Sequence, residues 1–158
     1  SFSKYFSMTG WRIGWLVVPE DHLRSVERLA QNMFICPPHV SQLAALAALQ
    51  SNDEMQANLA VYRENRRLML QGLPEAGLTQ IAPPDGAFYI YADISEFGVD
   101  SRTFAVEVLQ EAGVALTPGL DFDPIRGGHT IRLSYAQATG EIIEGLRRLN
   151  RFMHNRYV

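Results

Sequence analysis

The N-terminal part of the chain shows apolar residues in two patterns, a continuous run and a helical repeat. The run covers residues 13–18 and ends at Pro19, which predicts a buried strand. The repeat that follows predicts a helix, and Glu20 or Asp21 can cap its start. Its apolar positions have the spacing of one helix face: Leu23, Val26, Leu29 and Met33.

Two more helices are predicted in the middle of the chain. Pro37 and Pro38 interrupt the backbone, and residues 40–50 then carry leucine and alanine on every side, which is typical of a helix buried all round. Ser51 and Glu54 form a capping-box pattern for the next helix, which we expect to run to about residue 71 and to end at the Gly-Leu-Pro that follows. The buried stripe of that helix is Met55, Leu59, Tyr62 and Met69.

The rest of the chain alternates between strand and helix patterns. Aromatic and β-branched residues predict strands at residues 86–93, 114–117 and 129–135. Helices are predicted from Ser101 to Gly113 and from Thr139 onward. No internal repeat or low-complexity tract is visible. This order predicts a compact α/β arrangement with a small antiparallel sheet.

Composition narrows the possible classes of protein. The chain has 158 residues, a length that fits one domain. Its formal charge of −3 argues against nucleic acid as the main partner, and no apolar run approaches the roughly 18 residues that span a membrane. Cys36 is the single cysteine and has no partner for an internal disulfide, which fits a reducing cytoplasm.

The candidate chemistry begins at Lys4, the only lysine among the fourteen Lys and Arg residues. Schiff-base chemistry needs an ammonium group that can lose its proton, which a guanidinium cannot do. Arg12 offers a planar fork for phosphate or carboxylate, and nearby apolar residues can supply a desolvating wall: Met8, Trp11 and Trp15. Residue types alone also fit an ordinary surface lysine in a flexible, serine-rich segment.

The order of these residues adds a resemblance. Ser-Phe-Ser-Lys at the start, followed by Met-Thr-Gly-Trp-Arg-Ile-Gly-Trp at residues 8–15, resembles the lysine segment of the class I/II aminotransferases, pyridoxal-phosphate enzymes of fold type I. The resemblance implies that Lys4 forms a Schiff base with pyridoxal 5′-phosphate. It also implies that Ser1, three residues before the lysine, and Arg12, eight residues after it, hold the cofactor phosphate.

A second candidate site lies in the last predicted strand. Alternation along the strand places Ile131, Leu133 and Tyr135 on one face and Arg132 and Ser134 on the other. The pattern alone is typical of an arginine on a solvated face. The resemblance implies instead that Arg132 binds the substrate carboxylate, with residues 84–89 and 117–119 supporting the site.

The same resemblance implies a domain organisation. Residues 1–50 would be the end of a large cofactor-binding domain, and residues 51–158 a linking helix followed by the small C-terminal α+β domain. Other residues that such a site needs precede the lysine in this family. We therefore expect the chain to be a fragment of a longer polypeptide, inactive by itself, whose parent is a homodimer acting on an amino acid and a 2-oxo acid.

The other residues with reactive or metal-binding side chains give weaker indications of a functional site. The four histidines show no metal-ligand spacing, Cys36 has no evident base partner, and Asp121 and Asp123 flank Phe122 in a turn-like stretch. Residues 31–36 contain no arginine, which argues against a dicarboxylate substrate in this family. Other functions stay open: a β-lyase or another fold type I lyase, the sensor domain of a pyridoxal-phosphate-binding transcription regulator, or a non-catalytic dimerisation module.

Overall fold

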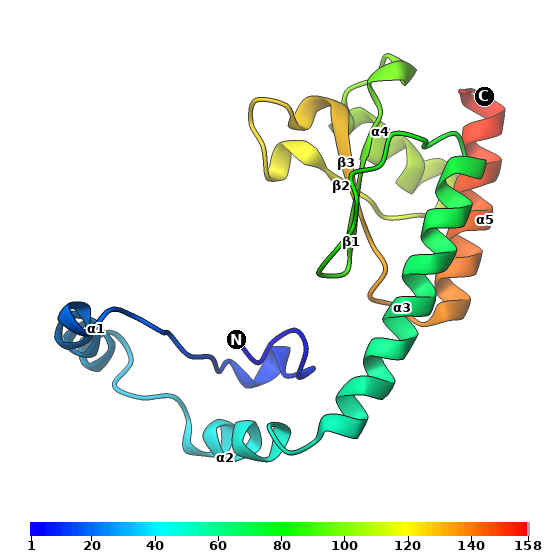
Figure 1. Ribbon diagram of the computed structural model, residues 1–158. Helices are drawn as coiled ribbons and strands as arrows, with labels where there is room; N and C mark the ends of the chain where they lie inside the picture. Colours follow the sequence, from blue (N-terminus) through cyan, green and yellow to red (C-terminus); the bar gives the residue numbers. More distant parts are fainter. Residues whose placement is uncertain (158) are drawn as a thin grey trace. The chain divides into compact units, whose positions relative to one another are not determined.

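The computed structural model describes residues 1–157 and divides into two compact units, Ser1–Leu59 and Ala60–Val158. The first unit holds an N-terminal loop, helix α1 (Glu20–Met33) and helix α2 (His39–Ala48). Helix α3 (Asn52–Glu75) begins in the first unit and continues into the second (Figure 1). The second unit contains the sheet and the remaining helices.

The N-terminal loop of the first unit packs on α2. Phe2 and Met8 are buried at 7% and 6% exposure, and they form a small core with Ala45. The small side chains of α2 allow this approach, since Ala44 and Ala48 also contact the cluster. The loop that carries Lys4 is therefore anchored by its aromatic and methionine side chains.

The strand predicted at residues 13–18 is wrong. This segment forms no strand ladder with a described residue, and its middle is exposed, with Leu16 at 75% and Val17 at 91%. An apolar run predicts burial, but a strand also needs a neighbouring backbone to satisfy its N–H and C=O groups. The cap predicted for α1 is also wrong, because Pro19 occupies the N-cap position and Glu20 and Asp21 lie in the first turn.

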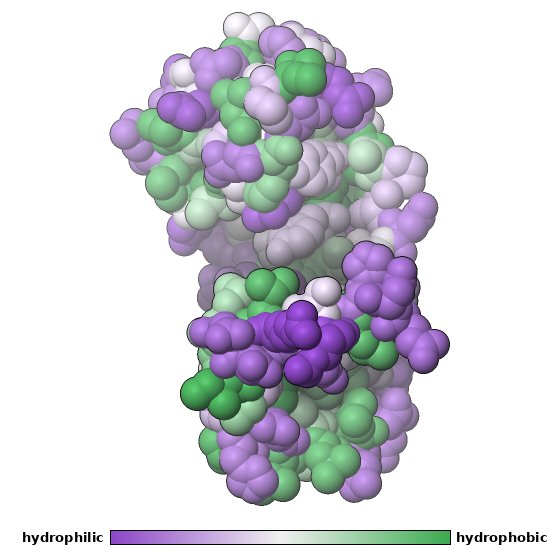
Figure 2. Space-filling view, turned by 90° about the vertical axis from the view of Figure 1, so that its left-hand side faces the viewer, coloured by the Kyte–Doolittle hydropathy of each residue, from purple (hydrophilic) through white to green (hydrophobic). Residues whose placement is uncertain are grey.

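Helix α2 was expected to be buried on every side, and it is not. Its buried residues are Ser41 and Ala45 alone. Large apolar side chains lie at the surface on and beside this helix: Val40, Leu43, Leu46 and Leu49. Figure 2 shows hydrophobic side chains among hydrophilic ones on one face of the molecule. Exposed apolar groups of this density are typical of a surface that contacts further protein.

The sheet of the second unit has three antiparallel strands in the order β1 (Tyr89–Asp93), β3 (Thr130–Ser134), β2 (Thr117–Pro118). This confirms the predicted antiparallel sheet, although β2 is shorter and later than the strand expected at residues 114–117. Pro118 is tolerated there because β2 is an edge strand. In the centre of the sheet, Arg132 lies opposite Tyr91 on β1 and Thr117 on β2.

Helices α4 (Ser101–Glu107) and α5 (Thr139–Arg156) pack with α3 against one face of the sheet (Figure 1). Ile131 and Leu133 of β3 point into this core at 0% and 4% exposure. A π-helical turn, Val108–Ala112, extends α4 and ends at Gly113, which has φ 66°. The opposite face of the sheet carries Arg132, so strand alternation separates the core from the candidate site.

Two features of α3 differ from the prediction. The Ser51 hydroxyl donates to the Ala47 carbonyl, at 3.2 Å, where the predicted capping box would have it accept from the following helix. The helix also continues through Pro74 and ends at Glu75, and Gly77 follows with a φ of 86°. Within α3, the fully buried Asn65 donates to the carbonyls of Tyr135 and Gln137, at 3.0 and 2.7 Å, and so attaches the helix to the end of β3.

The connection from β2 to β3 closes on itself through two glycines. A Cβ atom added to Gly127 would overlap the backbone of Gly119, and one added to Gly119 would overlap Thr130. The buried Ser101 hydroxyl donates to the Gly127 carbonyl at 2.7 Å, and the Gly127 amide donates to the Asp123 carbonyl at 2.8 Å. We call residues 119–127 the closed loop.

Replacing Gly127 by alanine should open this loop. We expect Gly127→Ala to lower the free energy of unfolding by about 1–3 kcal/mol, because the added methyl group cannot fit without moving backbone. The neighbouring Gly128→Ala is the matched control, since nothing lies within 4 Å of its added Cβ. Denaturant unfolding of both variants measures the difference, and equal stability would contradict the backbone contact described here.

Candidate functional site

The segment around Lys4 is a folded loop with a defined backbone. The Phe2 amide donates to the Ile13 carbonyl at 3.2 Å, which brings the start of the chain beside the residue that follows Arg12. The Ser7 amide donates to the Lys4 carbonyl at 2.9 Å and closes a turn at the lysine. Both Ser7 and Arg12 have left-handed backbones, with φ of 55° and 51°. We call residues 1–14 the lysine loop.

Side chains hold the lysine loop in place from within and from α3. The Thr9 hydroxyl donates to the Ser3 carbonyl at 2.8 Å. From the first turns of α3, Gln56 donates to the Tyr5 hydroxyl at 2.8 Å and Asn58 donates to the Ser7 hydroxyl at 3.3 Å. Gly14 lies beside Ser1, because a Cβ added to it would be 3.4 Å from the Cα of Ser1. Ser1 and Arg12 thus belong to one end of the same loop.

The polar groups of the lysine loop are a suitable donor set for a phosphorylated aldehyde. Arg12 makes one hydrogen bond, to the Thr9 carbonyl at 2.8 Å, and no ion pair with a described residue. The Ser1 hydroxyl accepts from the Ser3 amide at 3.1 Å, which leaves its own hydrogen for an acceptor. Guanidinium and hydroxyl fit a phosphate, and the amine of Lys4 fits an aldehyde.

The apolar wall expected around Lys4 is absent from the described residues. Lys4 is exposed, as are Trp11 and Trp15 at 44% and 55%. Met8 packs into the core of the loop, and Trp15 makes an edge contact with Phe2 at 5.1 Å between ring centroids. Those side chains therefore stabilise the loop itself and do not desolvate the amine.

Arg132 lies in the second unit in an unusual environment. Its guanidinium carbon is 4.2 Å from the ring centroid of Tyr89 and 4.1 Å from that of Phe122. The Nε atom is buried and has no hydrogen-bond partner, and the side chain forms no ion pair with a described residue. A half-buried cation without a carboxylate partner is suited to an anionic ligand, because its charge is partly removed from water and not compensated.

Phe122 is the site residue that sequence reasoning missed, whereas Tyr89 lies in residues 84–89, which the resemblance already placed in support of the site. Tyr89 lies two residues before Tyr91, the cross-strand neighbour of Arg132, and so on the same face of β1; its position could be found once the register was known. Phe122 belongs to the closed loop, and only the folding of that loop brings it over the guanidinium. The sequence suggested its neighbours Asp121 and Asp123 as a possible carboxylate pair. In the structure, the Asp123 carboxylate accepts hydrogen bonds from the amides of Ile125 and Arg126.

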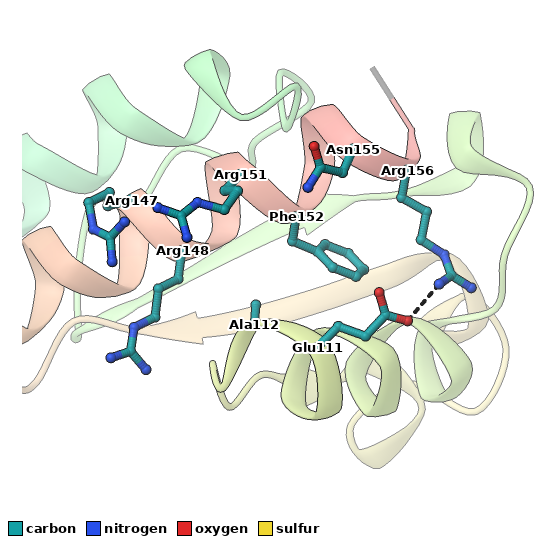
Figure 3. A pocket seen from close by; sticks show the side chains of 8 residues that line it. All are labelled: Glu111, Ala112, Arg147, Arg148, Arg151, Phe152, Asn155 and Arg156. Atoms are coloured by element: carbon teal, nitrogen blue, oxygen red, sulfur yellow. Dashed lines mark hydrogen bonds and ion pairs between the residues drawn. The ribbon is translucent and has the colours of Figure 1, made fainter.

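A second arginine-rich place lies on α5, where a cavity of about 480 Å³ is lined by Glu111, Ala112, Arg147, Arg148, Arg151, Phe152, Asn155 and Arg156. Figure 3 shows Arg156 reaching across to Glu111. Glu144 pairs with both Arg147 and Arg148, and these two hydrogen bonds lower the pKa of its carboxyl to about 2. Three of the four arginines already have carboxylate partners, so this cavity is an ion-paired surface rather than a site that needs an anion.

The other candidates named from the sequence have structural surroundings. His22 contacts the adjacent Asp21, and His154 contacts the Asn150 carbonyl. No group of three metal-ligating residues exists among residues 1–157. Cys36 is exposed. None of the helices in the described part of the chain is long and apolar enough to cross a membrane.

Comparison with known proteins identifies relatives of this chain. The family model described as aminotransferase class I and II matches residues 1–149. A valine–pyruvate aminotransferase of Mycobacterium tuberculosis is 49% identical over 97% of this chain and 40% of its own length. The chain thus spans about 40% of the length of the curated relatives it matches.

Solved structures resemble the chain equally well. A crystallised protein of Silicibacter pomeroyi is 68% identical, has a TM-score of 0.94, and is matched over 99% of this chain and 42% of its own. An aminotransferase from Mycobacterium tuberculosis is 48% identical, also has a TM-score of 0.94, and is matched over 98% of this chain and 41% of its own. The fold class predicted from the sequence, part of a fold type I architecture with a small antiparallel sheet, is confirmed.

The closed loop that carries Phe122 should respond to acid through Asp123. Backbone hydrogen bonds from Arg126 and Ile125 lower the pKa of this carboxyl below its usual value of about 3.9. A lowered pKa in the folded state means that the carboxylate stabilises the loop above the unfolded pKa, and that this stabilisation is lost as the pH falls through the folded pKa.

We therefore expect Asp123→Asn to speed hydrogen exchange of the Ile125 and Arg126 amides at neutral pH. The difference from the unmodified chain should disappear below the folded pKa of Asp123. Asp121→Asn is the matched control, because the Asp121 side chain makes no hydrogen bond with a described residue. A difference that persists unchanged in acid would contradict this role of the charge.

Proposed function

This chain belongs to the class I and II aminotransferases, and on that premise we propose that it is the C-terminal part of a pyridoxal-phosphate-dependent enzyme that moves an amino group between an amino acid and a 2-oxo acid. Residues 1–50 are assigned to the end of its large domain. Residues 51–158 are assigned to the linking helix and the small domain. The observation that carries the proposal is the lysine loop, which holds Lys4, Ser1 and Arg12 in one folded segment.

In this proposal each residue has a separate task. Bound pyridoxal 5′-phosphate supplies an electron sink for the substrate α-carbon. Lys4 is its point of covalent attachment, and its Nζ atom afterwards takes the proton from the substrate α-carbon and returns one. The Arg12 guanidinium and the Ser1 hydroxyl bind the phosphate, since Arg12 has no carboxylate partner among the described residues.

Arg132 binds the carboxylate of the amino acid and orients it. A guanidinium binds a carboxylate through two parallel hydrogen bonds, which fix both position and rotation. The exposed apolar side chains of the first unit are assigned to contacts with the rest of the enzyme and with a second subunit. The isolated chain, at about 40% of its relatives' length, is expected to be inactive, and the single exposed Cys36 fits the cytoplasm.

The preferred amino acid in this proposal has a neutral side chain. Residues 31–36, just before Pro37, include no arginine for a second carboxylate, and the valine–pyruvate aminotransferase is 49% identical to the chain. A lyase of the same fold would use the same lysine and arginines. Product analysis separates the two reactions, because a lyase releases ammonia and an aminotransferase transfers the amino group to the 2-oxo acid.

The attachment of the cofactor to Lys4 can be tested directly. Full-length enzyme mixed with pyridoxal 5′-phosphate should gain an absorbance band that borohydride reduction fixes as a stable C–N bond. Peptide mass mapping should place that bond on Lys4, and Lys4→Arg should abolish it, since a guanidinium cannot take this role. The absence of attachment in the full-length protein would overturn the enzyme assignment.

The carboxylate site can be tested by steady-state kinetics. We expect Arg132→Lys to lower kcat/KM of the full-length enzyme by about 10- to 100-fold, because charge-assisted hydrogen bonds contribute about 1.5–3 kcal/mol and lysine cannot bind a carboxylate as a planar fork. Arg147→Lys is the matched control, since that arginine is paired with Glu144. Equal loss in both variants would argue against a specific role for Arg132.

A further inference from the structure

The surroundings of Arg132 determine which part of its guanidinium a ligand can reach. The Nε atom is buried and unpartnered, so a ligand cannot reach it. The terminal Nη1–Nη2 edge is therefore the only part of the guanidinium that can meet a carboxylate. Arg132 is half-buried and rises from the central strand, where Tyr91 and Thr117 are its neighbours on either side.

Two aromatic rings restrict the remaining freedom of this guanidinium. Cation–π contacts at 4.1 and 4.2 Å are well within the distance at which a ring face attracts a guanidinium. The backbone of Tyr89 is fixed by strand β1, because the next residue, Ile90, is fully buried in the core. Phe122 is 50% exposed, so its ring is not part of the core and its contact with Arg132 is not a by-product of core packing.

The closed loop holds Phe122 in place. The amides of Phe122 and Asp123 both donate to the Gly119 carbonyl, at 2.9 Å each. The backbone contact between Gly119 and Gly127 and the bond from Ser101 close the loop from the other side. A half-exposed ring on a backbone fixed in this way loses little further entropy when it packs on another group.

We propose that Phe122 is a positioning residue for the substrate carboxylate: together with Tyr89 it holds the Arg132 guanidinium so that its terminal edge, and only that edge, is presented to the ligand. This rests on the proposed function of Arg132. The rings also exclude water from the faces of the guanidinium, which strengthens the ion pair formed at its edge. An aromatic ring is required at position 122, and an aliphatic side chain of similar size is not sufficient.

Nuclear magnetic resonance of the 158-residue chain, labelled with ¹⁵N-arginine, provides the first test. Ring currents should shift the Arg132 Nε–Hε signal away from those of the other arginines. Phe122→Leu should reduce this shift, whereas Phe122→Tyr should preserve it. An unchanged signal in Phe122→Leu would overturn the contact itself.

Titration with pyruvate, a simple 2-oxo carboxylate, tests the role in binding. Pyruvate should move the Arg132 signal of the unmodified chain, and sodium chloride at equal ionic strength should not. We expect Phe122→Ala and Phe122→Leu to weaken pyruvate binding by about 3- to 30-fold, the range for loss of one cation–π contact. Phe122→Tyr should bind as the unmodified chain does.

The controls separate this inference from the proposed function. Ile125→Ala lies in the same loop and removes a side chain that is 90% exposed, so it should leave both the signal and the affinity unchanged. If pyruvate moves the signal of the unmodified chain and Phe122→Leu binds equally well, the role of Phe122 is overturned while Arg132 stands. If pyruvate moves the Arg132 signal neither in the unmodified chain nor in the full-length enzyme, the assignment of Arg132 fails as well.

Discussion

The alternation of side chains along β3 is the constraint on which the second unit depends. Ile131 and Leu133 point into the core formed with α3, α4 and α5, and Arg132 between them must point the other way. A register shift of one residue would place the arginine in the core and two large apolar side chains at the site. The same alternation thus stabilises the fold and exposes the charge. Burial of β3 and orientation of Arg132 cannot be separated.

Local patterns were sufficient for most of the second unit and for the helices of the first. The apolar repeat predicted α1 and α5, the residues after Gly86 predicted β1, and the alternation around Arg132 predicted β3. The failures share one cause. Residues 13–18 and α2 are apolar and were expected to be buried, but burial depends on what packs against a segment. No part of the described chain covers Leu16, Val17 or the large apolar side chains of α2.

The lysine loop could be predicted from the sequence more fully than the surroundings of Arg132. Lys4, Ser1 and Arg12 are close in sequence, so their common loop follows from a short segment. The neighbours of Arg132 come from β1 and from the closed loop, and no periodicity connects Phe122 to a strand that begins at Thr130. The contact depends on Gly119 and Gly127 approaching backbone to backbone, which only two residues without side chains allow. Such a contact becomes visible once the loop is folded.

The two margins of the sheet are closed to further strands by different means. Pro118 lacks an amide hydrogen at the β2 margin, so an incoming strand would find no donor at that position. At the β1 margin, Ala82 donates to the Tyr91 carbonyl and Asp93 donates to the Gln80 carbonyl, so the segment around Ile81 already occupies that side. The sheet therefore resists edge-to-edge pairing with the strands of other molecules.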